Sequence, residues 1–405
     1  MNWIREHFWI LAILILSVAL RISLGQDRDR WPLTTAEADW ERRGLIYATH
    51  GLGVEDLTTY RSPLYPLSVA AIYAGLGTKT VFVRAYQTIL SVLTLLVIYR
   101  LAHRLTDPRS PLVAAVIAGF YPLWTLIGAS ILPNTLTTFV AALTCLVAVR
   151  TIENPSVGRA LLFGGVCGLC SLASLVEIIW VPVIVGVVLW FSSEGPFGDQ
   201  FNRFGAVACG VLVVLVPWMI RNEVVTGHRL FPPNNTGMEL LIGQEPGARG
   251  ILDVLRDYVS IYERAGIDAL DPVDKDDRVF AEMVRIMRES PGRTARLAGR
   301  KVWLLWNSVM LNAPSTTRNA HFVSGVLVSV LGVLGLYVNR RSAMAVVVAS
   351  MVLVWTLYGA IFYVTPELRL PVDVCLVPFA ASTGLLCLNR VRSVIASRFR
   401  ELGSE

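Results

Sequence analysis

Long apolar stretches alternate with short polar connections along most of the chain. About 17–25 predominantly apolar residues suffice for a helix to cross the hydrocarbon core of a bilayer. The first stretch follows Arg5 and has no small-residue cleavage site after it, so we expect a retained anchor rather than a signal peptide. Ten stretches of roughly this length predict ten transmembrane helices, at 7–25, 81–102, 110–129, 131–149, 159–173, 175–192, 204–220, 321–338, 343–363 and 370–388.

Two further apolar segments are too short to cross a membrane. They are residues 63–77, which begin with Pro-Leu-Tyr-Pro, and residues 301–312, which carry two tryptophans. Tyrosine and tryptophan favour the headgroup region of a bilayer. We therefore expect both segments to be interfacial or half-inserted helices at the membrane surface.

Composition supports a polytopic membrane protein. Of the 405 residues, 54% are hydrophobic and 16% are charged, whereas a soluble domain has about 25% charged residues. This balance excludes a disordered chain, a disulfide scaffold and most soluble enzymes, and a net charge of +6 indicates no nucleic-acid partner. Cys167 and Cys170 have the spacing of a redox or zinc motif, but Gly164 and Gly168 beside them favour a close helix contact.

The charges predict the orientation of the chain. Arginines concentrate in the short connections, which the positive-inside rule places in the cytoplasm together with both termini. Residues 26–62 and 222–301 form two long, acid-rich outside loops that hold two-thirds of the carboxylates. The small size and the arginine-rich loops favour a bacterial plasma membrane as the location.

The same pattern divides the chain into three parts. Residues 1–221 form an N-terminal transmembrane module, 222–320 an extracytoplasmic loop and 321–405 a C-terminal transmembrane module. Within the loop, residues 273–300 have helical apolar spacing that Ser290-Pro291 interrupts. A loop of this size cannot bury much core alone, so we expect it to lie on the membrane part and to cover something.

Unusual charged residues gather at the outer ends of the predicted spans. They are Glu177, Arg221, Glu367, Arg369 and Asp373. A single arginine at a span end can extend its guanidinium to the lipid headgroups. Several charged side chains at one depth, beside the acid-rich loops, instead favour a functional site.

The first outside loop has the sequence TTAEADWERRG from Thr34. Thr34 or Thr35 can cap a short helix, on which Glu37 and Glu41 share a face while Asp39 points elsewhere. A carboxylate held just above the bilayer can act as a general base or bind a divalent cation. The alternative is a solvated acidic helix with no chemical role.

These residues resemble a known family. The chain is similar to the lipid-linked-sugar glycosyltransferases of the GT-C fold, in the branch with protein O-mannosyltransferases and the aminoarabinose transferase of lipid A. The resemblance implies an all-α bundle of about ten transmembrane helices with interfacial helices and a small extracytoplasmic helical loop. It rests on the acidic first loop and three later motifs, which begin at Arg61 (R-x-P-L-Y-P), Pro217 (P-W-x-x-R-N) and Tyr363 (Y-x-x-x-E-x-R-x-P).

The resemblance implies transfer of a sugar from a polyprenyl-phosphate donor to an acceptor hydroxyl of a glycan, lipid or protein at the extracytoplasmic face, with inversion. Glu37, or else Asp39, would be the base, and the same two would bind Mg²⁺ or Mn²⁺ if a metal is used. Arg61, Arg221 and Arg369 would hold the donor phosphate, because guanidinium matches phosphate oxygens. The lipid and substrate groove would be formed by Tyr60, Tyr65, Asn134, Glu177, Asn222 and Glu367.

The chain departs from the family at three positions. Ala36 stands where an aspartate is expected, Pro133-Asn134 replaces Ser-Glu, and Glu177 replaces an arginine. These changes imply a different donor or a rearranged site. Two other interpretations stay open: a transporter or flippase, which would need charged residues near the bilayer midplane, and a non-catalytic scaffold of a cell-envelope glycan assembly system.

Overall fold

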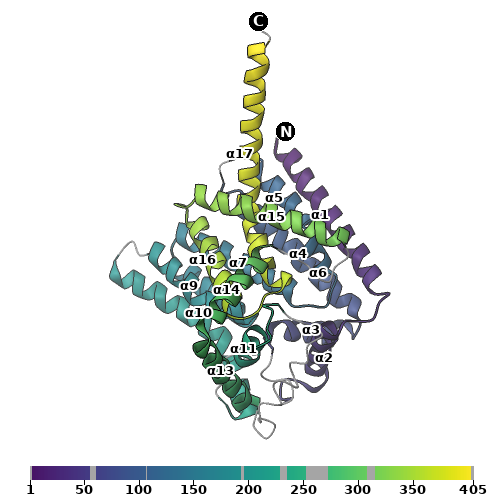
Figure 1. Cartoon of the computed structure of the whole chain (residues 1–405), viewed down its shortest axis with the longest axis vertical. Helices are drawn as coiled ribbons and strands as arrows, with labels where there is room; N and C mark the ends of the chain where they lie inside the picture. The colour runs from purple at the N-terminus through teal and green to yellow at the C-terminus, as the bar shows by residue number, and fades with distance from the viewer. Residues whose placement is uncertain are drawn as a thin grey trace.

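The computed structural model describes residues 2–54, 61–105, 107–192, 196–228, 235–251, 272–307 and 315–402. The described residues are mostly helical, and an isolated parallel bridge joins Ile251 to Val364. The two ends of the chain lie at the same end of the molecule (Figure 1). Helices α2, α3, α11 and α13 lie toward the opposite end.

Each of the ten predicted spans coincides with a helix or a helix pair. Seven helices are long and apolar enough to cross a membrane on their own, and the pair α5–α6, bent by 52°, makes an eighth span if counted together. Helices α8 and α9 have 15 and 17 residues and are shorter than each of those seven helices. The bounds are α1 Asn2–Arg28, α4 Thr80–Ala102, α5 Ser110–Gly119, α6 Pro122–Gly128, α7 Asn134–Glu153, α8 Val157–Ser171, α9 Leu175–Phe191, α10 Phe197–Thr226, α15 Ser315–Val338, α16 Ala343–Ile361 and α17 Leu370–Leu402.

The remaining helices lie between the spans in sequence. Pro291 begins a new helix directly after Ser290, so the predicted interruption is present. The segment expected at 301–312 belongs to a longer helix that ends at Asn307, and residues 308–312 lie outside the described part. The bounds are α2 Thr35–His50, α3 Leu64–Leu76, α11 Thr236–Gln244, α13 Pro272–Glu289, α14 Pro291–Asn307 and the short 3₁₀ helix η2 Pro366–Arg369.

Helices α8 and α10 are in backbone contact through glycines. A Cβ atom added at Gly164 would lie 2.1 Å from the carbonyl oxygen of Val207, and one at Gly210 would lie 2.3 Å from that of Leu161. Small residues permit such close approach between helices in a membrane. Cys167 and Cys170 are buried free thiols on α8, which agrees with the predicted packing role of this segment.

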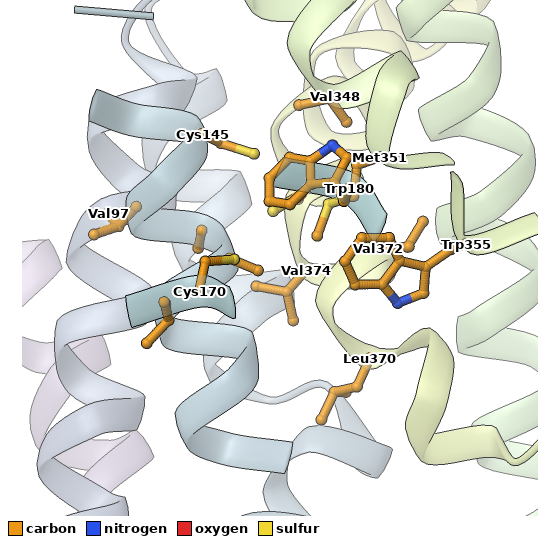
Figure 2. Close-up of a cluster of buried hydrophobic side chains, with 14 of the residues drawn as sticks. Val97, Cys145, Cys170, Trp180, Val348, Met351, Trp355, Leu370, Val372 and Val374 are labelled. Atoms are coloured by element: carbon orange, nitrogen blue, oxygen red, sulfur yellow. The ribbon is translucent and has the colours of Figure 1, made fainter. Parts of the chain in front are cut away.

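The core of the bundle contains two tryptophans from distant helices. The indole rings of Trp180 on α9 and Trp355 on α16 meet edge to face, with centroids 5.6 Å apart. Figure 2 shows both rings in a cluster with Cys145, Cys170 and Met351. The indole nitrogens donate to the Ser350 hydroxyl and to the Leu368 carbonyl, at 3.0 and 2.9 Å. Both polar ends of this apolar pair are therefore satisfied, as buried donors require.

The second outside loop is attached to the transmembrane helices, as expected for a segment without a core of its own. The Lys301 ammonium on α14 and the Gln244 amide on α11 both donate to the Ile361 carbonyl at the end of α16, at 2.8 and 2.6 Å. The Val364 amide donates to the Gly250 carbonyl at 3.1 Å. These bonds hold α11 and α14 against the C-terminal end of α16.

Candidate functional site

A cavity of about 170 Å³ lies where helices α2 and α11 meet the apolar helices α7, α9 and α16. Trp40 of α2, Asn134 of α7, Glu239 of α11 and Trp355 of α16 contribute to its wall. The loop between α8 and α9 and the turn before α17 complete it. With Arg61 and Ser62 before α3, seven separate parts of the chain thus converge on one cavity, and four of its lining residues are ionisable: Arg61, Glu177, Glu239 and Glu367.

Arg61 is the cation of this cavity. Its guanidinium lies over the Trp40 ring, 5.1 Å from the centroid, and its Nε is 3.4 Å from Oδ2 of Asp39. Trp40 in turn packs edge to face on Tyr65, with centroids 5.7 Å apart. About 40% of the Arg61 side chain is exposed. The guanidinium is therefore oriented by neighbours on one side and open to a ligand on the other.

Glu239 presents a carboxylate to the cavity from the short helix α11. Its Oε2 accepts from the Tyr358 hydroxyl at 3.0 Å, and its Oε1 accepts from the Asn235 amide at 3.1 Å. Burial raises the pKa of Glu239 above its ordinary value, although hydrogen bonds from Tyr358, Tyr363 and Asn235 and the charge of Arg61 act in the opposite direction. Sequence reasoning missed this residue, because nothing in its local sequence distinguishes it from other loop acids.

Glu177 forms part of the cavity wall in the first turn of α9. The residue is fully buried, and in the part of the chain that the structure describes neither carboxylate oxygen has a well-formed hydrogen bond. Trp180 of the core pair lies on the same helix, and Trp355, the other member, lines the same cavity. Glu367 completes the three carboxylates from the 3₁₀ helix η2. The cavity therefore holds three carboxyl side chains beside its arginine, whereas binding a phosphate would need only the arginine.

Glu37, the first candidate base, lies elsewhere. Its carboxylate closes a capping box with Thr34, accepts from the Ile131 amide at 3.2 Å and forms an ion pair with Arg28. Burial alone would raise the pKa of Glu37, but these hydrogen bonds lower it below the ordinary value. The side chain is 1% exposed and does not line the cavity. Its contacts are those of a residue that fixes the start of α2.

Asp39, the second candidate, lies behind Arg61. Its carboxylate is 3.1 Å from Nε of Arg43, 3.7 Å from Nη2 of Arg42 and 3.4 Å from Nε of Arg61. Burial raises the pKa of Asp39, but the three arginines outweigh it and the pKa is below the ordinary value. The structure thus places Asp39 as the partner that orients Arg61, outside the set of residues that line the cavity.

Arg221 is held by the loop that follows α2. Its guanidinium donates to the carbonyls of Leu52 and Val54 at 2.7 and 3.1 Å and to the Asn222 side chain at 3.2 Å, and it lies over the Trp218 ring. Neither Arg221 nor Asn222 lines the cavity. These contacts join the end of α10 to the first outside loop.

Arg369 is occupied by contacts inside the fold. Its guanidinium pairs with Asp373 at 2.8 Å and donates to the carbonyls of Leu305 and Trp306 at 2.9 and 2.8 Å. Tyr121 also donates to Asp373, at 2.7 Å. Arg369 is 1% exposed, so this buried cluster joins α14 and α6 to the start of α17.

The structure therefore brings together some of the predicted residues and separates others. Arg61, Asn134, Glu177 and Glu367 line one cavity, and Tyr65 supports it through Trp40. Tyr60 lies outside the described residues. The additional lining residues that the sequence did not indicate include Thr137, Ser174, Asn235, Glu239, Trp355 and Tyr358.

The predicted metal ligands do not fit a divalent cation. Glu37 is saturated by donors and paired with Arg28, and Asp39 faces three arginines. Among the residues that the structure describes, no group of three or more His, Cys, Asp or Glu side chains is arranged to hold a metal ion. A cation at either carboxylate would have to displace an existing guanidinium.

Comparison with known proteins gives a partial family match and a fold. Residues 60–220 match the family described as dolichyl-phosphate-mannose-protein mannosyltransferase. No curated protein matches the chain. The match begins just before Arg61 and ends in the C-terminal part of α10, so it includes the cation of the cavity and the wall residues from α7 and α9.

Two solved structures of one archaeal enzyme share the fold of this chain. The apo oligosaccharyltransferase of Archaeoglobus fulgidus is 14% identical over 98% of this chain and 53% of that chain, with a TM-score of 0.57. The same protein, AglB, in complex with an inhibitory peptide and a dolichol-phosphate, is also 14% identical, over 98% and 52%, with a TM-score of 0.51. ArnT from Cupriavidus metallidurans, bound to undecaprenyl phosphate, is 15% identical over 94% and 77%, with a TM-score of 0.44.

The chain spans about half the length of the archaeal enzyme that it matches. The all-α membrane bundle and the GT-C-like arrangement expected from the sequence are confirmed by its helices and by this structural likeness. The chain is an integral membrane protein of the GT-C glycosyltransferase fold, similar over residues 60–220 to the dolichyl-phosphate-mannose-protein mannosyltransferases.

Proposed function

We propose that this protein is a membrane glycosyltransferase that moves a sugar from a polyprenyl-phosphate donor to an acceptor hydroxyl of a glycan, lipid or protein. The description of the matching family names dolichyl-phosphate-mannose, and the archaeal oligosaccharyltransferase of similar fold was solved in complex with a dolichol-phosphate. We place the reaction at the extracytoplasmic face of a bacterial plasma membrane, with both termini in the cytoplasm. The distribution of arginines and carboxylates along the chain supports this orientation.

The observation that carries the proposal is the cavity around Arg61. A polyprenyl-phosphate sugar has its lipid in the bilayer and its phosphate at the interface, which is where the outside helices meet the apolar ones. Arg61 is open on one side and held on the other by Asp39 and Trp40. A guanidinium binds phosphate oxygens through two parallel hydrogen bonds, so Arg61 suits the donor phosphate.

Charge changes during the reaction explain why Arg61 would matter. The acceptor oxygen attacks the anomeric carbon, and the bond from that carbon to the phosphate oxygen breaks with its electron pair on the phosphate. Arg61 would stabilise the negative charge that grows on this leaving group, and such stabilisation is a large part of many enzymatic rate enhancements. A single displacement inverts the anomeric centre.

The test uses purified full-length protein and radiolabelled undecaprenyl-phosphate mannose, with simple alcohols as acceptors. Wild-type protein should release mannoside, and Arg61→Ala should lower turnover by roughly 10²–10³-fold, the range for removal of one transition-state donor. Arg285→Ala serves as the matched control, because Arg285 is an exposed arginine on α13 that pairs only with neighbouring glutamates in the described structure. Equal turnover in both variants would exclude the phosphate role of Arg61.

The same experiment separates the other two interpretations. A transporter would move the labelled lipid between leaflets of a proteoliposome without cleaving it. A scaffold would leave the lipid in place and intact. Release of mannoside with the anomeric configuration inverted distinguishes the enzyme from both.

A further inference from the structure

The proposed reaction needs a group that removes the acceptor proton, and the residues at the first loop do not supply it in this structure. Glu37 accepts four hydrogen bonds or ion-pair contacts in its capping box and lies outside the cavity. Asp39 is surrounded by three arginines. A general base must reach the proton that it removes, directly or through one water. The base should therefore be sought among the carboxylates that line the cavity.

Three carboxylates line it, and their settings differ. Glu177 is fully buried in the first turn of α9, at the wall nearest the core. Glu367 is on a four-residue 3₁₀ helix, and no hydrogen bond from the described residues fixes its carboxylate. Glu239 is partly accessible, and it is fixed because Tyr358 and Asn235 each donate to one of its oxygens and Tyr363 supplies a third hydrogen bond. A carboxylate has about four acceptor positions, so Glu239 keeps room for an acceptor hydroxyl.

We infer that Glu239 is the catalytic base of the proposed glycosyl transfer. The inference rests on the proposed function and names a residue for it that lies outside the matched segment 60–220. Its helix α11 belongs to the segment between α10 and α15, and Glu239 lines the same cavity as Arg61. An acceptor that enters between the outside helices would meet Glu239, while the donor phosphate would meet Arg61 in the same cavity.

The proton and electrons balance without a further reactant. The acceptor O–H bond breaks as its proton passes to a carboxylate oxygen of Glu239. The freed oxygen forms the new bond to the anomeric carbon, and the phosphate leaves with the electron pair of the old bond. The proton then passes from Glu239 to water. Burial raises the pKa of this carboxyl, which brings it nearer the working pH where a base is most effective.

Contacts between α13 and α11 also fix the position of Glu239. The Asp276 carboxylate of α13 accepts from the amides of Gly237 and Met238 in the first turn of α11, at 2.8 and 3.0 Å. A Cβ atom at Gly237 would lie 2.1 Å from the Asp276 carbonyl oxygen, so only glycine permits this approach. Glu239 lies two residues further on. Asp276 is thus a positioning residue for the base.

The test compares Glu239→Gln with wild-type protein on acceptors of different acidity. Undecaprenyl-phosphate mannose is the donor, and ethanol, 2-fluoroethanol and trifluoroethanol are the acceptors. Loss of a general base should cost roughly 10²–10⁴-fold in turnover with ethanol. The loss should shrink steadily toward trifluoroethanol, because a more acidic hydroxyl needs less help to lose its proton. Glu282→Gln, an exposed glutamate on α13, is the matched control and should keep wild-type turnover with every acceptor.

The outcomes separate this inference from the proposed function. If wild-type protein transfers no mannose, both fall. If wild-type protein is active and Glu239→Gln keeps its rate, or loses the same factor with every alcohol, Glu239 is not the base while the glycosyltransferase activity stands. If Glu367→Gln instead shows the acidity-dependent loss, the base is on η2. Thermal unfolding of each variant, followed by light scattering, identifies any variant that fails to fold. If Glu239→Gln fails to fold, Glu239→Asp, which keeps the carboxylate, is compared with wild-type protein in the same alcohol series. Its loss of turnover should also shrink from ethanol to trifluoroethanol, and an equal loss with every alcohol would overturn the assignment.

Discussion

The contact between α8 and α10 gives a sharp test of the packing, because it can be altered by one methyl group. A Cβ atom at Gly164 would lie 2.1 Å from the Val207 carbonyl oxygen, whereas ordinary contact begins at 3.4 Å. The atom that it meets is backbone and cannot rotate away. The two helices would have to move apart by roughly 1 Å, and overpacking of this kind typically costs about 1–3 kcal/mol.

Gly165 provides the matched control at the next position of the same helix. A Cβ atom there meets nothing within 4 Å. Both Gly→Ala changes add the same intrinsic helix preference, about 1 kcal/mol, so the difference between the two variants isolates the contact. We expect Gly164→Ala to unfold several degrees below Gly165→Ala, and Gly165→Ala to equal or exceed wild-type protein.

The buried thiols of α8 supply the assay. In a background where the other two buried thiols, Cys145 and Cys375, are replaced by alanine, a maleimide dye should label Cys167 and Cys170 only as α8 separates from its neighbours, above the constant signal of the exposed Cys209 and Cys387. The midpoint of labelling against temperature then reports on this contact directly. Equal midpoints for the two alanine variants would refute the close approach of the two backbones.

Three further predictions concern the charged groups. Burial lowers the pKa of Lys301 to about 7 from the ordinary 10.5. Because the unfolded chain keeps a proton that the folded chain releases between these values, thermal stability should rise as pH increases from about 7 to 10.5. A Lys301→Met variant that keeps the same rise in melting temperature would contradict the assignment. Glu37→Gln should lower the melting temperature by weakening the charge-assisted bond to Arg28, worth roughly 1.5–3 kcal/mol, whereas turnover lost at an unchanged melting temperature would restore Glu37 as the candidate base. Asp373→Asn leaves the Arg369 guanidinium buried without its counter-charge and should lower the free energy of unfolding by about 3–5 kcal/mol. The yield of folded protein in mild detergent should then fall below that of wild type, and an unchanged yield would show that this ion pair is not required.

The transmembrane part was predictable because burial in lipid leaves a strong pattern in the sequence. Long apolar runs located all ten helical segments, and the bend between α5 and α6 falls at Tyr121-Pro122, where a proline disfavours helix in the residue before it. The glycine spacing around Gly164 also indicated a helix contact correctly. These features depend on residues that are close in sequence.

The cavity could be predicted only in part, because side-chain partners depend on segments far apart in the chain. Arg369 has the expected position at a span end, yet its direction is set by the carbonyls of Leu305 and Trp306, more than sixty residues earlier. Glu239 lies in the cavity because Asp276 and Tyr358 hold it there. No local pattern distinguishes a loop glutamate that reaches a cavity from one that faces water.

The contact between Glu37 and the Ile131 amide has a consequence for how the protein is made. The two residues are 94 positions apart, and chains emerge from the ribosome at about 5–20 residues per second. The first outside loop has its local capping box early, but it cannot form this bond until the helices up to the α6–α7 turn have been made. For that interval the carboxylate has Thr34 and Arg28 as partners but lacks its final one. Biogenesis of the N-terminal module is therefore ordered, with the first loop finishing its fold after later helices have entered the membrane.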